Sequence, residues 1–176
     1  MQNRYIMTAF GKDRPGIVAD VTSVLYETGC NLEDSTMSML SDEFTINLLF
    51  SSSDEKIEAK LLDRCAEMEK TRSISAFIRP LKERSAVGKP NAAIATIHVE
   101  GLDQAGIVYK ISQYLADNSL NIIDLKSIVK TTPESGTSLY LMDIHIHLTG
   151  GATPEAIEAG LDDVAEELNV EITVTR

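Results

Sequence analysis

The chain has 176 residues, of which 43% are hydrophobic and 24% are charged, as in ordinary soluble globular proteins. Its net charge of −11 is unevenly spread, with −2 on residues 1–90 and −9 on residues 91–176. Because the chain lacks a basic stripe and zinc-ligand spacing, we expect no direct nucleic-acid partner. No apolar run reaches the ~20 residues that span a bilayer, and the N-terminus lacks a secretory pattern. We therefore expect a cytoplasmic protein with no membrane partner.

The first half of the chain reads as alternating strands and helices. The predicted elements are a strand at 5–10, a helix at 17–28, strands at 31–40 and 43–51, a helix at 57–68 and a strand at 73–79. The apolar stripe of the first helix includes Val18. Gly29 is expected to end this helix, because glycine permits a left-handed cap. The second helix places Leu62 on its apolar face and has Ser53 as its expected cap.

The second half repeats the first at an offset of 90 residues. Gly, Asp, Gly, Ile and Val of residues 11–18 recur at residues 101–108, and the same register continues without a gap to residue 124. The second copy predicts a strand at 95–99, a helix at 107–115, strands at 121–132 and 137–149, a helix from Pro154 to 168 and a strand at 170–175. Asn118 or Ser119 is expected to end its first helix, and Thr153 to cap its second.

The order β-α-β-β-α-β, present twice, predicts an α+β fold with two ferredoxin-like domains in tandem. We expect domain 1 at residues 1–80, a linker at 81–91 that contains Gly88-Lys-Pro90, and domain 2 at residues 92–176. Each copy has ~85 residues and can bury only a modest core.

The turn between the first strand and the first helix carries the chemistry. Asp13 can cap the helix, Pro15 suits its first turn, and Gly16 lets a ligand approach the backbone. The helix N-terminus can hold a carboxylate, while Asp13, Asn31 and Asp34 can meet an ammonium group. A zwitterionic amino acid needs this combination. The alternative, which the turn alone favours, is that these residues form only a well-capped helix start.

The runs T8-A-F-G-K-D-R-P-G-I-V18, G29-C-N-L-E-D-S35 and M39-L-S-D-E-F-T45 resemble the ACT domain, and more specifically the glycine cleavage system transcriptional repressor family. In ACT domains that bind amino acids, the ligand sits between two copies. The resemblance implies first-copy ligand contacts at Asp13, Arg14, Pro15, Gly16, Ile17, Asn31 and Asp34. It implies weaker second-copy counterparts at Asp103, Gly106, Ile107, Asn121 and Asp124. The second copy departs from the pattern at Gln104 and Ala105.

The resemblance implies a protein without enzymatic activity that senses a small amino acid, with glycine or serine as the candidates. It would act on a protein partner such as a transcriptional activator, and we expect a homodimer because exposed strand edges tend to be covered. Two alternatives remain open. One is a detached regulatory module that binds a metabolic enzyme, although the two copies leave no room for a catalytic domain. The other is an assembly protein with no ligand.

Other candidate chemistry is weaker. Asp143, His145 and His147 share a strand face, and His98 is expected on the corresponding face of the first strand of the repeat. We interpret this face as solvated or interfacial and expect no metal, because no fourth ligand is evident. Cys30 and Cys65 are expected to be free thiols. We expect no catalytic residue and no cofactor, since no GxSxG, GxGxxG or Walker sequence is present.

Overall fold

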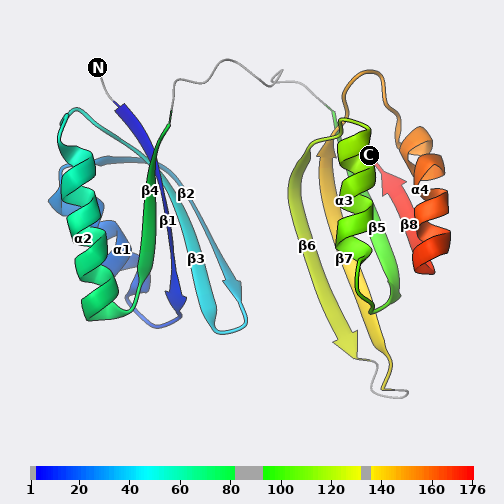
Figure 1. The fold of residues 1–176 in the computed structure, drawn as a ribbon, viewed down its shortest axis with the longest axis horizontal. Coiled ribbons are helices and arrows are strands. Elements are labelled where there is room, and N and C mark those ends of the chain that lie inside the picture. The colour runs from blue at the N-terminus through cyan, green and yellow to red at the C-terminus, as the bar shows by residue number, and fades with distance from the viewer. Residues whose placement is uncertain (1–2, 82–92, 132–135) are drawn as a thin grey trace. The chain divides into compact units, whose positions relative to one another are not determined.

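The computed structural model describes residues 3–81, 93–131 and 136–176 (Figure 1). The chain divides into two compact units, residues 1–85 and 86–176. Each unit closes its own hydrophobic core. The predicted linker at 81–91 and the predicted turn at 133–136 fall almost wholly outside the described residues.

The first unit is a four-stranded antiparallel sheet with two helices on one face (Figure 1). Alternation along its two central strands turns their apolar side chains toward the helices, where they are buried. The sheet order is β2-β3-β1-β4, so β2 and β4 form the edges. Its elements are β1 (Asn3–Lys12), α1 (Ile17–Glu27), β2 (Asn31–Leu40), β3 (Glu43–Ser52), α2 (Ile57–Arg72) and β4 (Ser75–Leu81).

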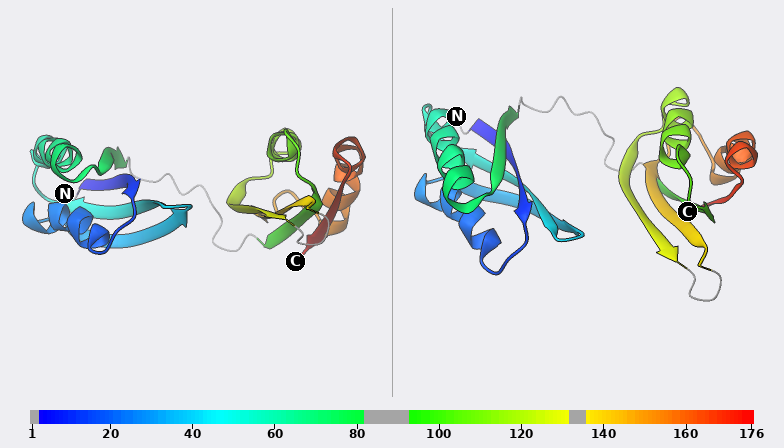
Figure 2. Two further views of the ribbon diagram at one scale, coloured as in Figure 1. Left: turned by 90° about the horizontal axis from the view of Figure 1, so that it is seen from below. Right: turned by 60° about the horizontal axis from the view of Figure 1, so that its bottom comes forward.

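The second unit has the same topology, with the sheet order β6-β7-β5-β8. Figure 2 shows that α3 and α4 again lie on one face of the sheet. The predicted β-α-β-β-α-β order and the ferredoxin-like fold class are therefore confirmed for both copies. The elements are β5 (Ile94–Leu102), α3 (Ile107–Asp117), β6 (Ile122–Thr131), β7 (Ser138–His147), α4 (Pro154–Leu168) and β8 (Val170–Thr175).

Three of the predicted helix ends are confirmed. Gly29 follows α1 with a φ of 70°, and Ser119 rather than Asn118 adopts the left-handed conformation after α3. The side chain of Thr153 accepts a hydrogen bond from the Ala156 N–H at the start of α4, with Pro154 at the first position.

The predicted cap of the second helix is wrong. The helix α2 begins at Ile57 with Lys56 at the cap position, and its cap makes no side-chain hydrogen bond. Asp54 instead accepts a hydrogen bond from the Lys56 N–H at 2.9 Å, so an aspartate turn leads the chain into the helix. Ser53 lies one residue before that turn and too far from the helix to cap it.

Two stripe assignments are also wrong. Leu62 is 53% exposed. The side of α2 that packs on the sheet is already formed by Ile57, Leu61, Cys65 and Met68. Val18 and its counterpart Val108 are each 40% exposed on the outer faces of α1 and α3. The helix faces that pack on the sheet are therefore narrower than the sequence pattern indicated.

Candidate functional site

The turn before α1 is a tight reverse turn over residues 14–17. The Ile17 N–H donates to the Arg14 carbonyl at 3.2 Å, and Gly16 has a φ of 87°. Pro15 followed by a left-handed glycine is the sequence that a type II turn requires. Gly106 has a φ of 101° at the same place in the second unit. Glycine is required at both positions because L side chains rarely adopt this conformation.

This geometry contradicts two predicted roles in helix capping. Asp13 does not cap the helix, because the cap position is Gly16 and no side chain bonds there. Asp13 lies four residues before the first helical residue, and its backbone N–H donates to the Asp42 carbonyl at 2.8 Å. Pro15 precedes the helix rather than occupying its first turn. The turn is therefore fastened to the β2–β3 hairpin by its backbone, which leaves the Asp13 side chain exposed at the tip.

Arg14 is held by an ion-pair network that the sequence analysis missed. Its guanidinium lies 2.5 Å from Asp20 Oδ2, and the guanidinium of Arg72 lies 2.5 Å from Asp20 Oδ1. Asp20 thus joins the turn to the last residue of α2 across the two helices. The ion pair with Asp20 holds the Arg14 side chain at the turn. The ligand contact expected of Arg14 stays a prediction.

The second unit replaces this network with one of reversed charge. Lys110, the counterpart of Asp20 at the 90-residue offset, forms an ion pair with Glu167 in the last turn of α4. Gln104, the counterpart of Arg14, donates to the carbonyl of Leu168. The departure of Gln104 from the first-copy pattern therefore has a structural reason, since an arginine there would face Lys110.

Asn31 and Asp34 lie at the opposite end of the first sheet from the turn. In the strand register, Lys12 pairs with Glu43 beside the hairpin, while Arg4 pairs with Ser51, which in turn pairs with Asn31. Eight residues of β1 separate the two ends, roughly 25 Å at the rise of a β-strand. One unit therefore does not bring the two halves of the predicted site together.

The end that holds Asn31 carries further polar groups on the open face of the sheet. Arg4 forms an ion pair with Glu33 at 2.7 Å, at a bulge where β2 shifts register against β3. The pKa of the Glu33 carboxyl is lowered, first by the Ser51 hydroxyl beneath it and then by Arg4. The Ser51 contact falls outside regular hydrogen-bond geometry, and that hydroxyl has no other partner among the described residues.

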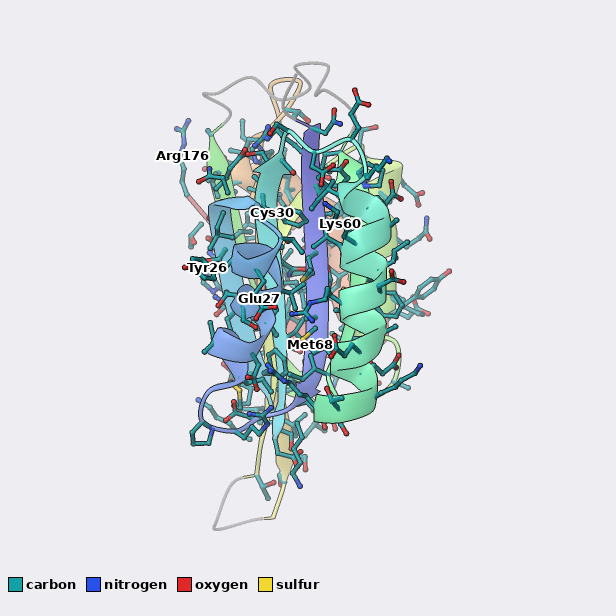
Figure 3. All side chains as sticks on the ribbon, turned by 90° about the vertical axis from the view of Figure 1, so that its left-hand side faces the viewer. Tyr26, Glu27, Cys30, Lys60, Met68 and Arg176 are labelled. Carbon is teal, nitrogen blue, oxygen red and sulfur yellow. The ribbon has the colours of Figure 1, made fainter. Side chains whose placement is uncertain are left out.

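On the other side of β2, an apolar groove of about 410 Å³ runs between the strand and α1. Tyr26, 86% exposed, stands at its outer rim, and Cys30 lies where the chain leaves α1 (Figure 3). Figure 3 also shows both helices in front of the sheet with β1 visible between them. The groove is lined by Ala19, Thr22, Ser23, Leu25, Tyr26, Cys30 and Leu32.

The second unit carries bulkier side chains at two of these positions. At the 90-residue offset, Ala19 is replaced by Tyr109 and Cys30 by Leu120, which is buried. Asp124, the counterpart of Asp34, lies 3.5 Å from both His145 and Lys126. Lys126 thus partly balances the charge of Asp124, whereas the Asp34 carboxylate accepts a hydrogen bond from the Ser35 N–H.

Of the remaining predicted contacts, two have buried side chains and two have backbone groups in hydrogen bonds within the protein. The side chains of Ile17 and Ile107 are buried in their cores, so only their backbones can reach a ligand. The Asp103 N–H donates to the Ser138 carbonyl, which fastens the second turn as Asp13 fastens the first. Asn121 lies just before β6, and its carbonyl accepts a hydrogen bond from the His147 N–H.

The histidine-rich face of the second sheet forms polar cross-strand pairs. His98 lies opposite Asp143, with 2.6 Å between Nδ1 and Oδ1, and its other ring nitrogen lies 3.2 Å from Thr175 Oγ1. Within residues 3–81, 93–131 and 136–176, no group of three or more His, Cys, Asp or Glu is placed to hold a metal ion.

The two thiols differ in their surroundings, which gives a first testable prediction. Both are free, but Cys65 is buried in the first core, and burial raises its pKa from 9.0 to about 11. Iodoacetamide at pH 8 should therefore label Cys30 at least tenfold faster than Cys65, as measured by peptide mass spectrometry. Equal labelling of the folded protein would contradict the buried position of Cys65.

The same shift predicts alkaline destabilisation. A thiol whose folded pKa is raised stabilises the fold fully below pH 9, and this contribution is lost as the pH rises toward 11. The loss is at most about 3 kcal/mol. Replacement of Cys65 by alanine should flatten the fall in the free energy of unfolding between these pH values, and an unchanged slope in this variant would contradict the prediction.

Comparison with known proteins agrees with this fold and turn. The ACT domain family model matches residues 3–73. A UPF0237 protein of Neisseria meningitidis serogroup A is 36% identical over 69 residues, 39% of this chain and 77% of that protein. A crystal structure of an unknown protein from Galdieria sulphuraria, 24% identical, superposes with a TM-score of 0.77 and covers 99% of this chain and 98% of that one. The chain therefore belongs to the ACT-domain proteins and carries two ferredoxin-like ACT domains in tandem.

The chain is also similar to a repressor protein along nearly its whole length. The glycine cleavage system transcriptional repressor of Escherichia coli strain K12 is 28% identical over 174 residues, which cover 97% of this chain and 88% of that protein. In the part of the chain that the structure describes, no helix is long and apolar enough to cross a membrane.

Proposed function

We propose that this chain is a cytoplasmic, non-enzymatic regulator that senses a small amino acid, glycine or serine. It passes the signal to a protein partner, such as a transcriptional activator of glycine metabolism. The similarity to the glycine cleavage system transcriptional repressor over 97% of the chain supports this function. The proposed domains are residues 1–80 and 92–176, with residues 81–91 as the linker.

The observation that carries the proposal is the separation of the two half-sites within one unit. The turn at Asp13–Ile17 and the start of β2 at Asn31 lie at opposite ends of the sheet. A single amino acid reaches both only if another unit, of the same chain or of a second chain, supplies one of them, and the exposed edge strand β2 favours a second chain. The proposed active form is therefore a homodimer, with each site shared by two chains.

The edge strands favour β2 as the place where a second molecule joins. Pro80 lies in edge strand β4 and cannot donate a backbone hydrogen bond, and the outer N–H of Val174 in β8 is already bonded to Glu158. Edge strand β6 carries Lys126 and Lys130. In contrast, β2 has neither proline nor lysine, and all ten of its residues are exposed.

Antiparallel pairing of two β2 strands would bring the half-sites together. The Leu40 end of one strand would then lie beside the Asn31 end of the other. Because the turn is bonded to Asp42, just beyond Leu40, it would travel with that end. No like charges would face each other, since Glu33 and Asp34 would lie opposite the uncharged end of the partner strand.

The chemistry of the shared site suits a zwitterion. In α1, the Ile17 and Asp20 N–H groups are bonded to Arg14 and Gly16 carbonyls, which leaves the N–H groups of Val18 and Ala19 for the ligand carboxylate. The Asn31 amide oxygen and the Asp34 carboxylate of the other chain accept hydrogen bonds from the ammonium. The same positions in the second unit are poorer, because Lys126 already forms an ion pair with Asp124.

Calorimetry against the twenty amino acids at millimolar concentration tests the proposal. We expect binding of glycine or serine, a loss of at least tenfold in affinity for Asn31→Ala, and little change for the matched variant Asn121→Ala in the second unit. Binding of no amino acid would refute sensing and favour an assembly protein. Equal losses for both variants would refute the assignment of the site to the first unit.

A further inference from the structure

The two helix pairs carry opposite charges at the same place in the fold. Asp20 on α1 meets Arg72 on α2 at 2.5 Å, whereas Lys110 on α3 meets Glu167 on α4. If α1 packed beside α4, Asp20 would face Glu167. If α3 packed beside α2, Lys110 would face Arg72. Each wrong pairing creates one repulsive contact, so a full exchange replaces the two attractive pairs by two repulsive ones.

A second contact discriminates between the helices by size. In the second unit the ring of Tyr114 on α3 packs against Gly160 on α4, where any added Cβ would overlap the tyrosine hydroxyl. The counterpart of Tyr114 in the first unit is Val24, and α2 contains no glycine. The ring of Tyr114 therefore fits over Gly160 on α4, whereas α2 offers no glycine to make room for it. If α1 packed on α4 instead, the smaller Val24 would leave a gap opposite Gly160.

We propose that these contacts make the helix pairs mutually exclusive, so that α1 assembles only with α2 and α3 only with α4. Two units of one fold on one chain are prone to exchange equivalent elements during folding, within a chain or between chains. The charges and the tyrosine–glycine contact oppose that exchange by penalising the wrong partner. This role is independent of any ligand and of the proposed sensing function.

Charge inversion in the full-length chain tests the proposal. The first variant inverts one unit only, with Arg14→Gln, Asp20→Lys and Arg72→Glu, which keeps an attractive pair in each unit but makes the two units alike. The matched control also carries Gln104→Arg, Lys110→Asp and Glu167→Arg, which restores opposite signs. All chains are unfolded in urea and refolded. Light scattering after size exclusion then measures the oligomer formed in excess of the same chain that was never unfolded, which accounts for the proposed homodimer.

We expect about fivefold more exchanged oligomer from the first variant than from the natural chain, the size expected for two exposed ion pairs. The control should return to the level of the natural chain. Addition of Tyr114→Val to the first variant should raise the exchanged fraction further. Equal fractions for the natural chain and the first variant would refute the proposal. Equal exchanged fractions for the first variant and its control would also refute it. In that case a loss of stability, and not the likeness of charge between the two units, would explain the exchange.

Discussion

A one-to-one mixture of two non-binding variants is expected to recover about a quarter of the amino-acid sites. Gly16→Val disturbs the turn, because valine rarely adopts the φ of 87° found there. The effect is confined to the backbone conformation, since a Cβ at this position meets no atom within 4 Å. Asn31→Ala removes the other half-site. In a mixed dimer one shared site carries both changes and the other carries neither, and random exchange makes half of the dimers mixed.

The measurement is the glycine or serine stoichiometry by calorimetry after the subunits have been exchanged. The matched control mixes Asn31→Ala with Asp34→Asn, two changes in the same half-site, and should recover nothing. If the Gly16→Val and Asn31→Ala mixture also recovers nothing while mass spectrometry detects mixed dimers, the shared site is wrong.

Replacement of Phe44 by alanine is expected to lower the free energy of unfolding of the first unit by about 3–5 kcal/mol. Phe44 is fully buried under the two helices, and the truncation removes apolar contacts and leaves a cavity. Hydrogen exchange followed by mass spectrometry should show faster exchange throughout β1, β3 and α2. Exchange in β5 and β7 should stay unchanged, because the core of the second unit contains only its own residues.

The matched control is Phe10→Ala on the open face of the same sheet. Phe10 is 43% exposed and stacks on Phe77 with 6.1 Å between ring centroids, so we expect a loss of about 1 kcal/mol. Equal destabilisation by the two substitutions would contradict the assignment of Phe44 to the core and Phe10 to the surface.

The sequence was most informative where its pattern has a strict period. Alternation at Tyr5, Met7 and Ala9 and the repeat at 90 residues predicted the strands, their buried faces and the fold. Successive side chains of a strand point to opposite faces of the sheet, so alternate residues are buried together. The helix faces were predicted too wide, as Leu62 and Val18 show. A helical stripe includes borderline positions, and only packing against the sheet decides which of them are covered.

The candidate site was predicted residue by residue but not in its arrangement. Local sequence pointed to the turn at Asp13–Ile17 and to Asn31, yet nothing local reports that the strand register separates them by the length of β1. The Arg72 contact was missed because residues 20 and 72 are distant in sequence. The reversed charge between Asp20 and Lys110 in the repeat was the one sequence signal that could have revealed it.

Because each unit closes its own core, either unit can change its surface without unfolding the other. A duplicated gene segment of this kind can diverge one half at a time. The first half carries Arg14 and Pro15 in its glycine turn, whereas the second half has Gln104 and Ala105 there and a net charge of −9 over residues 91–176. Substitutions in the turn and substitutions that change the surface charge can therefore collect in separate halves of one chain.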